Sequence, residues 1–133
     1  MAYEIINPEA LGAPKGWSNG MLAPAGGRIL FVAGQTASDR SGKVQPADFI
    51  TQFDRALQNV MTVVTEAGGN AEHIGRFTIF VTDREAYLSD LRALGQAYRK
   101  NMGRHFPAMA LVEVKALVDP DAVVEIEATA VLP

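Results

Sequence analysis

The stretch HFPAMALVEVKALVDPDAVVEIEATAV, residues 105 to 131, decides the fold of this chain. It contains two runs in which alternate residues are apolar. Successive side chains of a strand point to opposite faces, so a period of two predicts β-strands. In the second run, alternate residues from Val124 to Ala130 form an apolar face, and Glu125 and Glu127 lie on the opposite face.

These glutamates leave two interpretations open. A carboxylate is costly to remove from water unless it is paired or hydrogen-bonded. The face that carries Glu125 and Glu127 is therefore either exposed to solvent or the wall of a polar cleft. Periodicity alone favours solvent, because charged side chains are mostly exposed.

The rest of the chain predicts four more strands and two helices. The strands are expected at residues 3–6, 17–22, 28–32 and 74–82, and the helices at 46–67 and from 87 or 89 to 102. Ser89 is a plausible N-cap of the second helix, and Gly95 inside it predicts close packing. The order β-β-β-α-β-α-β-β predicts one two-layer α+β domain over residues 1–133, with a mixed six-stranded sheet and both helices on one face.

Two helices can cover only one face of this sheet, yet some strands are apolar on both faces. The residues that need a second cover are Ile29 or Leu30, Phe31, Leu111, Val123 and Val131. A homo-oligomer formed through the uncovered face would bury them. Clefts between subunits would then be lined by the face that carries Glu125.

Composition excludes several classes of function. The 133 residues have a formal net charge of −3 and no basic run, which argues against nucleic acid as a partner. No cysteine is present, so disulfides and thiolate chemistry are excluded, and two histidines without cysteine make no plausible zinc site. No apolar run approaches the roughly 20 residues of a membrane span. The N-terminus lacks signal-peptide features, and we expect a cytoplasmic protein.

Five segments carry a resemblance that covers nearly the whole chain. They are RILFVAGQT at 28–36, the helix at 49–68, FVTD at 80–83, FPA at 106–108 and VEIEA at 124–128. In order and spacing they resemble the Rid family, also called the YjgF family. The resemblance implies a chorismate-mutase-like fold and a homotrimer with three clefts between subunits. It also implies that the last strand lies between the strands that begin at Arg28 and Ile74, whereas the short link at 118–121 alone suggests a hairpin.

The best-known activity of the family is hydrolysis of reactive enamines and imines to a carbonyl compound and ammonia. An arginine holds the substrate carboxylate, a glutamate positions water, an aromatic residue covers the substrate, and backbone groups beside a glycine hold its polar end. No metal or organic cofactor is implied. Family members have also been described as ribonucleases, which the acidic charge of this chain does not support.

Transferred residue by residue, the resemblance makes Glu125 the catalytic glutamate and Gly34 the glycine. Trp17 stands at the aromatic position, which is often tyrosine, and Ala33 at a position that is often serine. The expected arginine after Phe-Pro-Ala is Met109, which cannot hold a carboxylate. Losing a charged hydrogen bond costs about 1.5–3 kcal/mol, or roughly 10- to 150-fold in affinity.

Two outcomes follow from this departure. The small-molecule substrate could be larger, more apolar or uncharged, with Met109, Leu111 and Trp17 lining its pocket. Alternatively, the protein is a non-catalytic trimer that binds small apolar molecules or unfolded chains. Arg28, Arg76, Arg92 or Arg104 could supply a replacement cation, but the sequence cannot place them.

Overall fold

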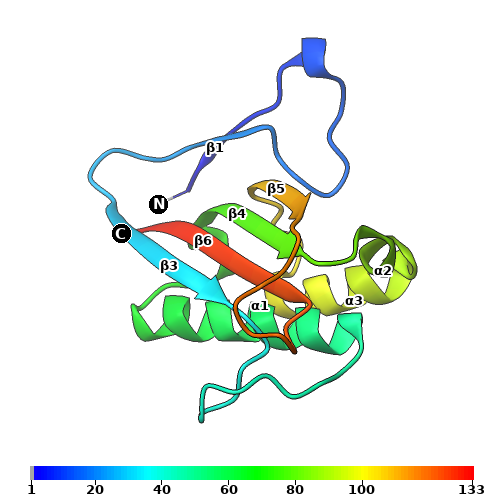
Figure 1. The fold of residues 1–133 in the computed structure, drawn as a ribbon. Helices are drawn as coiled ribbons and strands as arrows, with labels where there is room; N and C mark the ends of the chain where they lie inside the picture. Colours follow the sequence, from blue (N-terminus) through cyan, green and yellow to red (C-terminus); the bar gives the residue numbers. More distant parts are fainter. Residues whose placement is uncertain (1) are drawn as a thin grey trace.

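The computed structural model describes residues 2–133 and confirms a two-layer α+β fold (Figure 1). The strands are β1 (Glu4–Ile6), β2 (Gly20–Leu22), β3 (Arg28–Gln35), β4 (Ile74–Val81), β5 (Ala108–Glu113) and β6 (Val124–Leu132). The helices are α1 (Phe49–Glu66), α2 (Arg84–Leu88) and α3 (Leu91–Met102), with short 3₁₀ helices at Glu9–Leu11 and Ala71–His73. The α-helices lie along one side of the main sheet.

The main sheet has the order β3-β6-β4-β5, so the last strand lies between β3 and β4 as the family resemblance implied. Strand β6 is antiparallel to both neighbours, and β4 and β5 are parallel. The hairpin suggested by the short link before β6 is therefore wrong. The α2–α3 segment forms the crossover that a parallel β4–β5 pair requires.

The prediction of one six-stranded sheet is also wrong, because the main sheet has four strands. Strands β1 and β2 pair only with each other and form a two-stranded ribbon beside the open side of the sheet (Figure 1). Each has three residues, too few to extend a long ladder. Side chains hold the ribbon instead: Tyr3 Oη donates to the His73 carbonyl over 2.7 Å, and Ser18 Oγ donates to the Phe106 carbonyl over 2.6 Å.

Polar caps set the helix boundaries. Helix α1 begins at Phe49, later than the predicted 46, because the Asp48 carboxylate accepts from Thr51 N over 2.8 Å. The second predicted helix is divided into α2 and α3 because Asp90 caps α3 by accepting from Ala93 N over 3.0 Å. Ser89 is the C-cap of α2, so its predicted role as an N-cap is wrong.

The core lies between the helices and one face of the sheet. Its largest fully buried apolar side chains include Phe77, Ile126, Leu57 and Leu132. Gln52 is also buried: its Nε2 donates to the Asp121 carbonyl and its Oε1 accepts from Val123 N, both over 2.9 Å. This pair of bonds fixes the chain just before β6, the strand that carries Glu125.

The sheet face away from the helices is open in the protomer. Phe31 and Ile29 are 78% and 62% exposed there, as predicted for residues that need a second cover. Leu111 and Val123 instead pack partly buried against the core, so they do not need that cover. Leu111 pairs with Ile79, whose side chain points to the helices, and pairing partners share a face.

Candidate functional site

Glu125 lies against the backbone of Gly34. A Cβ built on Gly34 would stand 2.7 Å from Oε2 and 2.9 Å from Cδ of Glu125, closer than real side chains approach. The glutamate therefore occupies the space that any side chain at position 34 would need. Gly34 does not have a positive φ, so glycine provides room here for the Glu125 carboxylate and not a special backbone conformation.

A β-bulge produces this contact. The pairing of β3 with β6 passes from Val32 opposite Ala128 to Gln35 opposite Ile126, which leaves Ala33 and Gly34 as two residues against one. A bulge bends a strand and redirects its side chains. Ala33 and Gly34 are both exposed, so the contact with Glu125 is open to solvent or to a neighbouring molecule.

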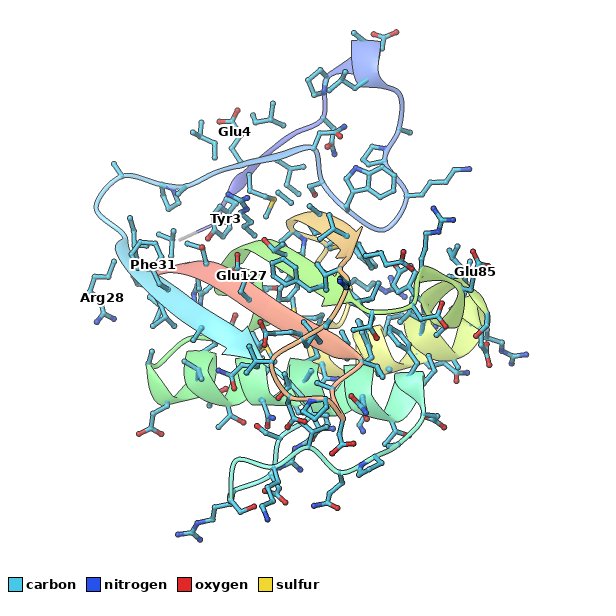
Figure 2. All side chains as sticks on the ribbon, viewed as in Figure 1. Tyr3, Glu4, Arg28, Phe31, Glu85 and Glu127 are labelled. Carbon is cyan, nitrogen blue, oxygen red and sulfur yellow. The ribbon has the colours of Figure 1, made fainter. Side chains whose placement is uncertain are left out.

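The carboxylate of Glu125 is half-buried and available. The residue opposite Glu125 is Phe80 on the neighbouring strand β4, and both side chains lie on the open face. No group within residues 2–133 donates a hydrogen bond to this carboxylate, so a water or a ligand can bind there. Glu127, two residues along, points to the same open side as Phe31 (Figure 2), in a small polar hollow of about 110 Å³ with Arg76.

Met109 belongs to a second group of residues, on the helix side of the edge strand β5. It pairs with Phe77 and packs against the core. A hollow of about 360 Å³ opens beside it, between the sheet, α2, α3 and the loop before β2. Its lining is formed by Lys15, Gly16, Phe53, Ile79, Tyr87, Leu91, Leu94, Gly95, Tyr98, Arg99, Phe106 and Met109.

Aromatic rings form one wall of this hollow. Tyr98 and Phe106 stack with centroids 5.3 Å apart and planes 7° from parallel. The Tyr98 hydroxyl donates to the His105 carbonyl over 2.6 Å, and burial raises its pKa, so the phenol stays protonated. Ser18, which the sequence analysis did not single out, ties the Lys15–Asn19 loop to the segment before β5 through the Phe106 and Pro107 carbonyls.

Trp17 lies on this same loop, next to Gly16. It is 42% exposed, and its Nε1 donates to Asn19 Oδ1 over 3.3 Å. The predicted substrate-binding residues thus form two groups in the protomer. Gly34 lies against Glu125, with Ala33 next to it in the bulge of β3, whereas Trp17, Met109 and Leu111 lie at the other edge of the sheet, the last two on its helix side.

None of the four arginines that the sequence offers as replacements for the missing one lines the hollow beside Met109. Arg28 Nε donates to the Pro133 carbonyl over 2.9 Å, Arg76 lies in the open-face hollow, and Arg92 is exposed on α3. Arg104 lines a different hollow. The cations that do lie beside Met109 are Lys15 and Arg99, which sequence reasoning missed.

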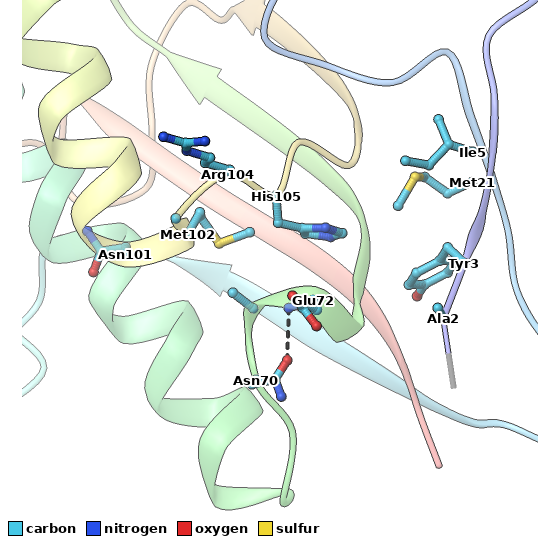
Figure 3. Close-up of a pocket in the computed structure, with 12 residues that line it drawn as sticks. Ala2, Tyr3, Ile5, Met21, Asn70, Glu72, Asn101, Met102, Arg104 and His105 are labelled. Carbon is cyan, nitrogen blue, oxygen red and sulfur yellow. Dashed lines mark hydrogen bonds between the residues drawn. The ribbon is translucent and has the colours of Figure 1, made fainter.

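A larger hollow, of about 760 Å³, is lined by Arg104 but by none of the residues to which the family resemblance assigns a role (Figure 3). Tyr3 and Met21 of the ribbon face Arg104 and His105 across it. His105 Nε2 donates to the Ile74 carbonyl over 2.7 Å, because a carbonyl can only accept. The hollow is the space beneath the ribbon, and we assign it no chemistry.

No helix in residues 2–133 combines the length and the apolarity needed to cross a bilayer. Within that range, no three His, Asp or Glu side chains gather so that they could hold a metal ion.

Comparisons with known proteins agree with the sequence motifs. The family model described as Endoribonuclease L-PSP matches residues 8–132. A RutC family protein of Pyrococcus abyssi is 31% identical over 131 residues, covering 98% of each chain. A protein of Escherichia coli K12 named putative reactive intermediate deaminase TdcF is 32% identical over 109 residues, covering 79% of this chain and 80% of that one.

Solved structures give the same result. A Yersinia pestis protein described as YyfB of the conserved Rid family, of unknown function, superposes with a TM-score of 0.86 at 30% identity and covers 99% of this chain and all of its own. Escherichia coli TdcF with bound serine has a TM-score of 0.66 at 29% identity over 92% of each chain. The protein therefore belongs to the Rid, or YjgF, family.

Proposed function

We propose that the protein is a cofactor-free deaminase that hydrolyses a reactive enamine or imine to a carbonyl compound and ammonia. The observation that carries the proposal is the unpartnered Glu125 carboxylate packed on Gly34. One relative lends support: Escherichia coli TdcF is named putative reactive intermediate deaminase, and its structure was solved with serine bound.

Glu125 can serve this reaction as a general base and acid. An imine carbon, once the nitrogen is protonated, is electrophilic enough to accept water without a metal. The carboxylate takes a proton from the attacking water, which forms a carbinolamine. It then returns the proton to the nitrogen, and as ammonia leaves the carboxylate accepts the proton of the carbinolamine hydroxyl, so that the carbonyl forms.

We further propose that the two groups of site residues meet between protomers of a homotrimer. Glu125 lies on the open face of the inner strand β6, whereas Met109 lies on the helix side of the edge strand β5, so one protomer does not bring them together. A contact between two different surfaces of the same chain closes into a ring when the rotation permits it. Such a ring would place the Glu125 group of one protomer against the Met109 hollow of the next, and bury Phe31 and Ile29.

The test is ammonia release from a panel of imines formed in place by an amino-acid oxidase acting on amino acids of increasing side-chain size. Because general acid–base groups contribute typically 10²- to 10⁴-fold, Glu125→Gln should lower the rate by about 100-fold or more. Glu127→Gln is the matched control, since Glu127 lies on the same strand and face. Equal rates for Glu125→Gln and the wild type would remove Glu125 from the mechanism.

A second candidate function is binding without turnover, by a trimer that holds small apolar molecules or unfolded chains. The observation that favours it is Met109 at the position where the family resemblance places arginine. Binding of an apolar probe, together with no ammonia release from any imine of the panel, would support this function over the deaminase.

A further inference from the structure

The hollow beside Met109 is lined by two cations and by no acidic residue. This is unexpected in a chain whose formal net charge is −3. The ion pairs of residues 2–133 are Arg84 with Glu85 and Lys100 with Asp54. Within that part of the chain, Lys15 and Arg99 therefore have no carboxylate partner and can bind an anion that enters the hollow.

Gly95 shapes the position of Arg99. The two residues are one helical turn apart on α3, so they share a face. A Cβ on Gly95 would lie 3.0 Å from Arg99 Nη1, which shows that the guanidinium folds back across the glycine. The sequence predicted close packing at Gly95; the structure has the end of the Arg99 side chain there, and both residues line the hollow.

The remaining lining suits an apolar body. Tyr87, Leu91 and Met109 contribute carbon and sulfur surface, and the stacked Tyr98–Phe106 pair gives a flat wall. A methionine side chain is flexible and polarizable, so it adapts to rings and chains alike. The volume of about 360 Å³ is at the lower end of the range for small-molecule sites.

We propose that this hollow binds a carboxylate that carries an aromatic or bulky apolar group, with Arg99 holding the carboxylate and Lys15 adding positive charge. Arg99, on α3, then performs the role that the family resemblance assigns to an arginine at position 109, on β5. The proposal names the substrate class of the deaminase and in that sense rests on the proposed function. The binding step, however, is measured without turnover.

Arg99 also has a simpler role that the test must separate. It lies with Lys100 in the last turn of α3, where a cation interacts favourably with the helix dipole. That interaction concerns helix stability and predicts no preference for a charged ligand. The preference of the protein for an acid over its neutral amide is therefore the readout that distinguishes the two roles.

The experiment is a calorimetric titration of the full-length protein with 3-phenylpropionate and with 3-phenylpropionamide. The wild type should bind the acid more tightly. Arg99→Gln should weaken acid binding by about 10-fold or more, the value expected for one charge-assisted hydrogen bond, and leave amide binding unchanged. Arg92→Gln is the matched control, because Arg92 lies on the same helix outside the hollow.

Gly95→Ala provides a second variant that does not alter either cation. Its methyl group should displace the Arg99 guanidinium and weaken acid binding, while the thermal midpoint stays equal or rises because alanine favours helix. Loss of affinity in this variant therefore cannot be attributed to unfolding. Trp17, the only tryptophan, lies on the loop beside the hollow and reports binding by fluorescence.

The outcomes separate this proposal from the deaminase. Equal affinity of the wild type for acid and amide, no binding of either, or an acid preference that survives Arg99→Gln would overturn the proposal, even if imines are hydrolysed. The Glu125→Gln variant should still bind the acid more tightly than the amide. If that preference depends on Arg99 but no imine is turned over, the binding proposal stands and the deaminase fails.

Discussion

The covered and open faces of the main sheet are built from alternate residues of the same strands, but they differ in how far their side chains are buried. On the covered face of β6, Ile126 has no exposed surface, and its neighbours along that face are buried as well. On the open face, Glu127 is exposed and Phe31 keeps 78% of its surface. The covered face is buried within one chain, whereas the open face leaves apolar side chains uncovered.

The contact between Glu125 and Gly34 places the candidate catalytic carboxylate on the open face. The half-buried carboxylate on the open face occupies space that the neighbouring strand leaves free because it has glycine at position 34. The covered side has a comparable exception to close packing, which is the hollow beside Met109. It remains open because Gly95 gives α3 no side chain at that point. Both exceptions place polar groups beside unfilled space, and both are the candidate binding surfaces.

The largest difference in stability is expected between two variants in which one side chain, on either face of β6, is shortened to alanine. Ile126→Ala should lower the free energy of unfolding by about 2–5 kcal/mol, because it leaves a cavity in the core. Glu127→Ala, one position along on the open face, should change it by no more than about 0.5 kcal/mol. Urea unfolding measures both, and similar values for the two variants would contradict the division into faces.

The open face should be needed for assembly and not for folding. Phe31→Glu places a charge where a homotrimer would bury an apolar ring, at a site worth about 1.5–3 kcal/mol per buried side chain. We expect light scattering at micromolar concentration to change from trimer to monomer, with an unchanged circular dichroism spectrum. Phe31→Leu should remain trimeric. A monomeric wild-type protein would contradict the proposal of a cleft between subunits.

Gly34→Ala should damage function more than stability. Its φ is open to alanine, so the strand can form, but the new methyl group would meet Oε2 of Glu125 and displace the carboxylate. Turnover should fall at least about 10-fold, equivalent to about 1.4 kcal/mol. Adding Glu125→Asp, which shortens the acid, should restore part of the rate; a single Gly34→Ala variant with full activity would contradict the contact.

The smallest expected effect concerns the outer surface of the helix layer. Burial tends to raise the pKa of Asp54, but hydrogen bonds from Lys100 and Asn101 lower it below its ordinary value. Ionised Asp54 thus stabilises the fold above its unfolded pKa of about 3.9, and this stabilisation is lost as pH falls through the folded pKa. Asp54→Asn should cost at most about 1 kcal/mol at pH 7.

The matched measurement is urea unfolding of Asp54→Asn and the wild type at pH 7 and at several values below pH 4. The difference between the two proteins should shrink as the solution becomes more acidic. A difference that grows toward acid pH would mean that the pKa of Asp54 is raised in the folded protein, which is the opposite sign.

Much of the fold followed from local patterns. Alternation identified Val124, Ile126, Ala128 and Ala130 as core, and all four are buried. The i, i+3, i+4 spacing located α1, and the family motifs predicted the central position of β6. The ribbon and the separation of α2 from α3 could not be predicted in the same way, because they depend on single side-chain hydrogen bonds such as those of Asp90 and Ser18.

The candidate site was predictable only in part. Motifs pointed to Glu125 and Gly34, and the structure places them in contact. They also pointed to Met109, but alternation cannot say which face of β5 is covered until β5 pairs with β4. Arg99 was missed because a basic residue near a helix C-terminus has an ordinary explanation in the helix dipole.

By itself the sequence determined which residues share a face, which segments form strands and helices, and which family motifs are intact or altered, because these depend on period and on residue type. Tertiary structure alone decided that the glutamate rests on a glycine from another strand, and that an arginine folds over Gly95 into a hollow beside Met109. Such contacts join residues that are distant in the chain or depend on side-chain direction, and a linear pattern does not contain that information.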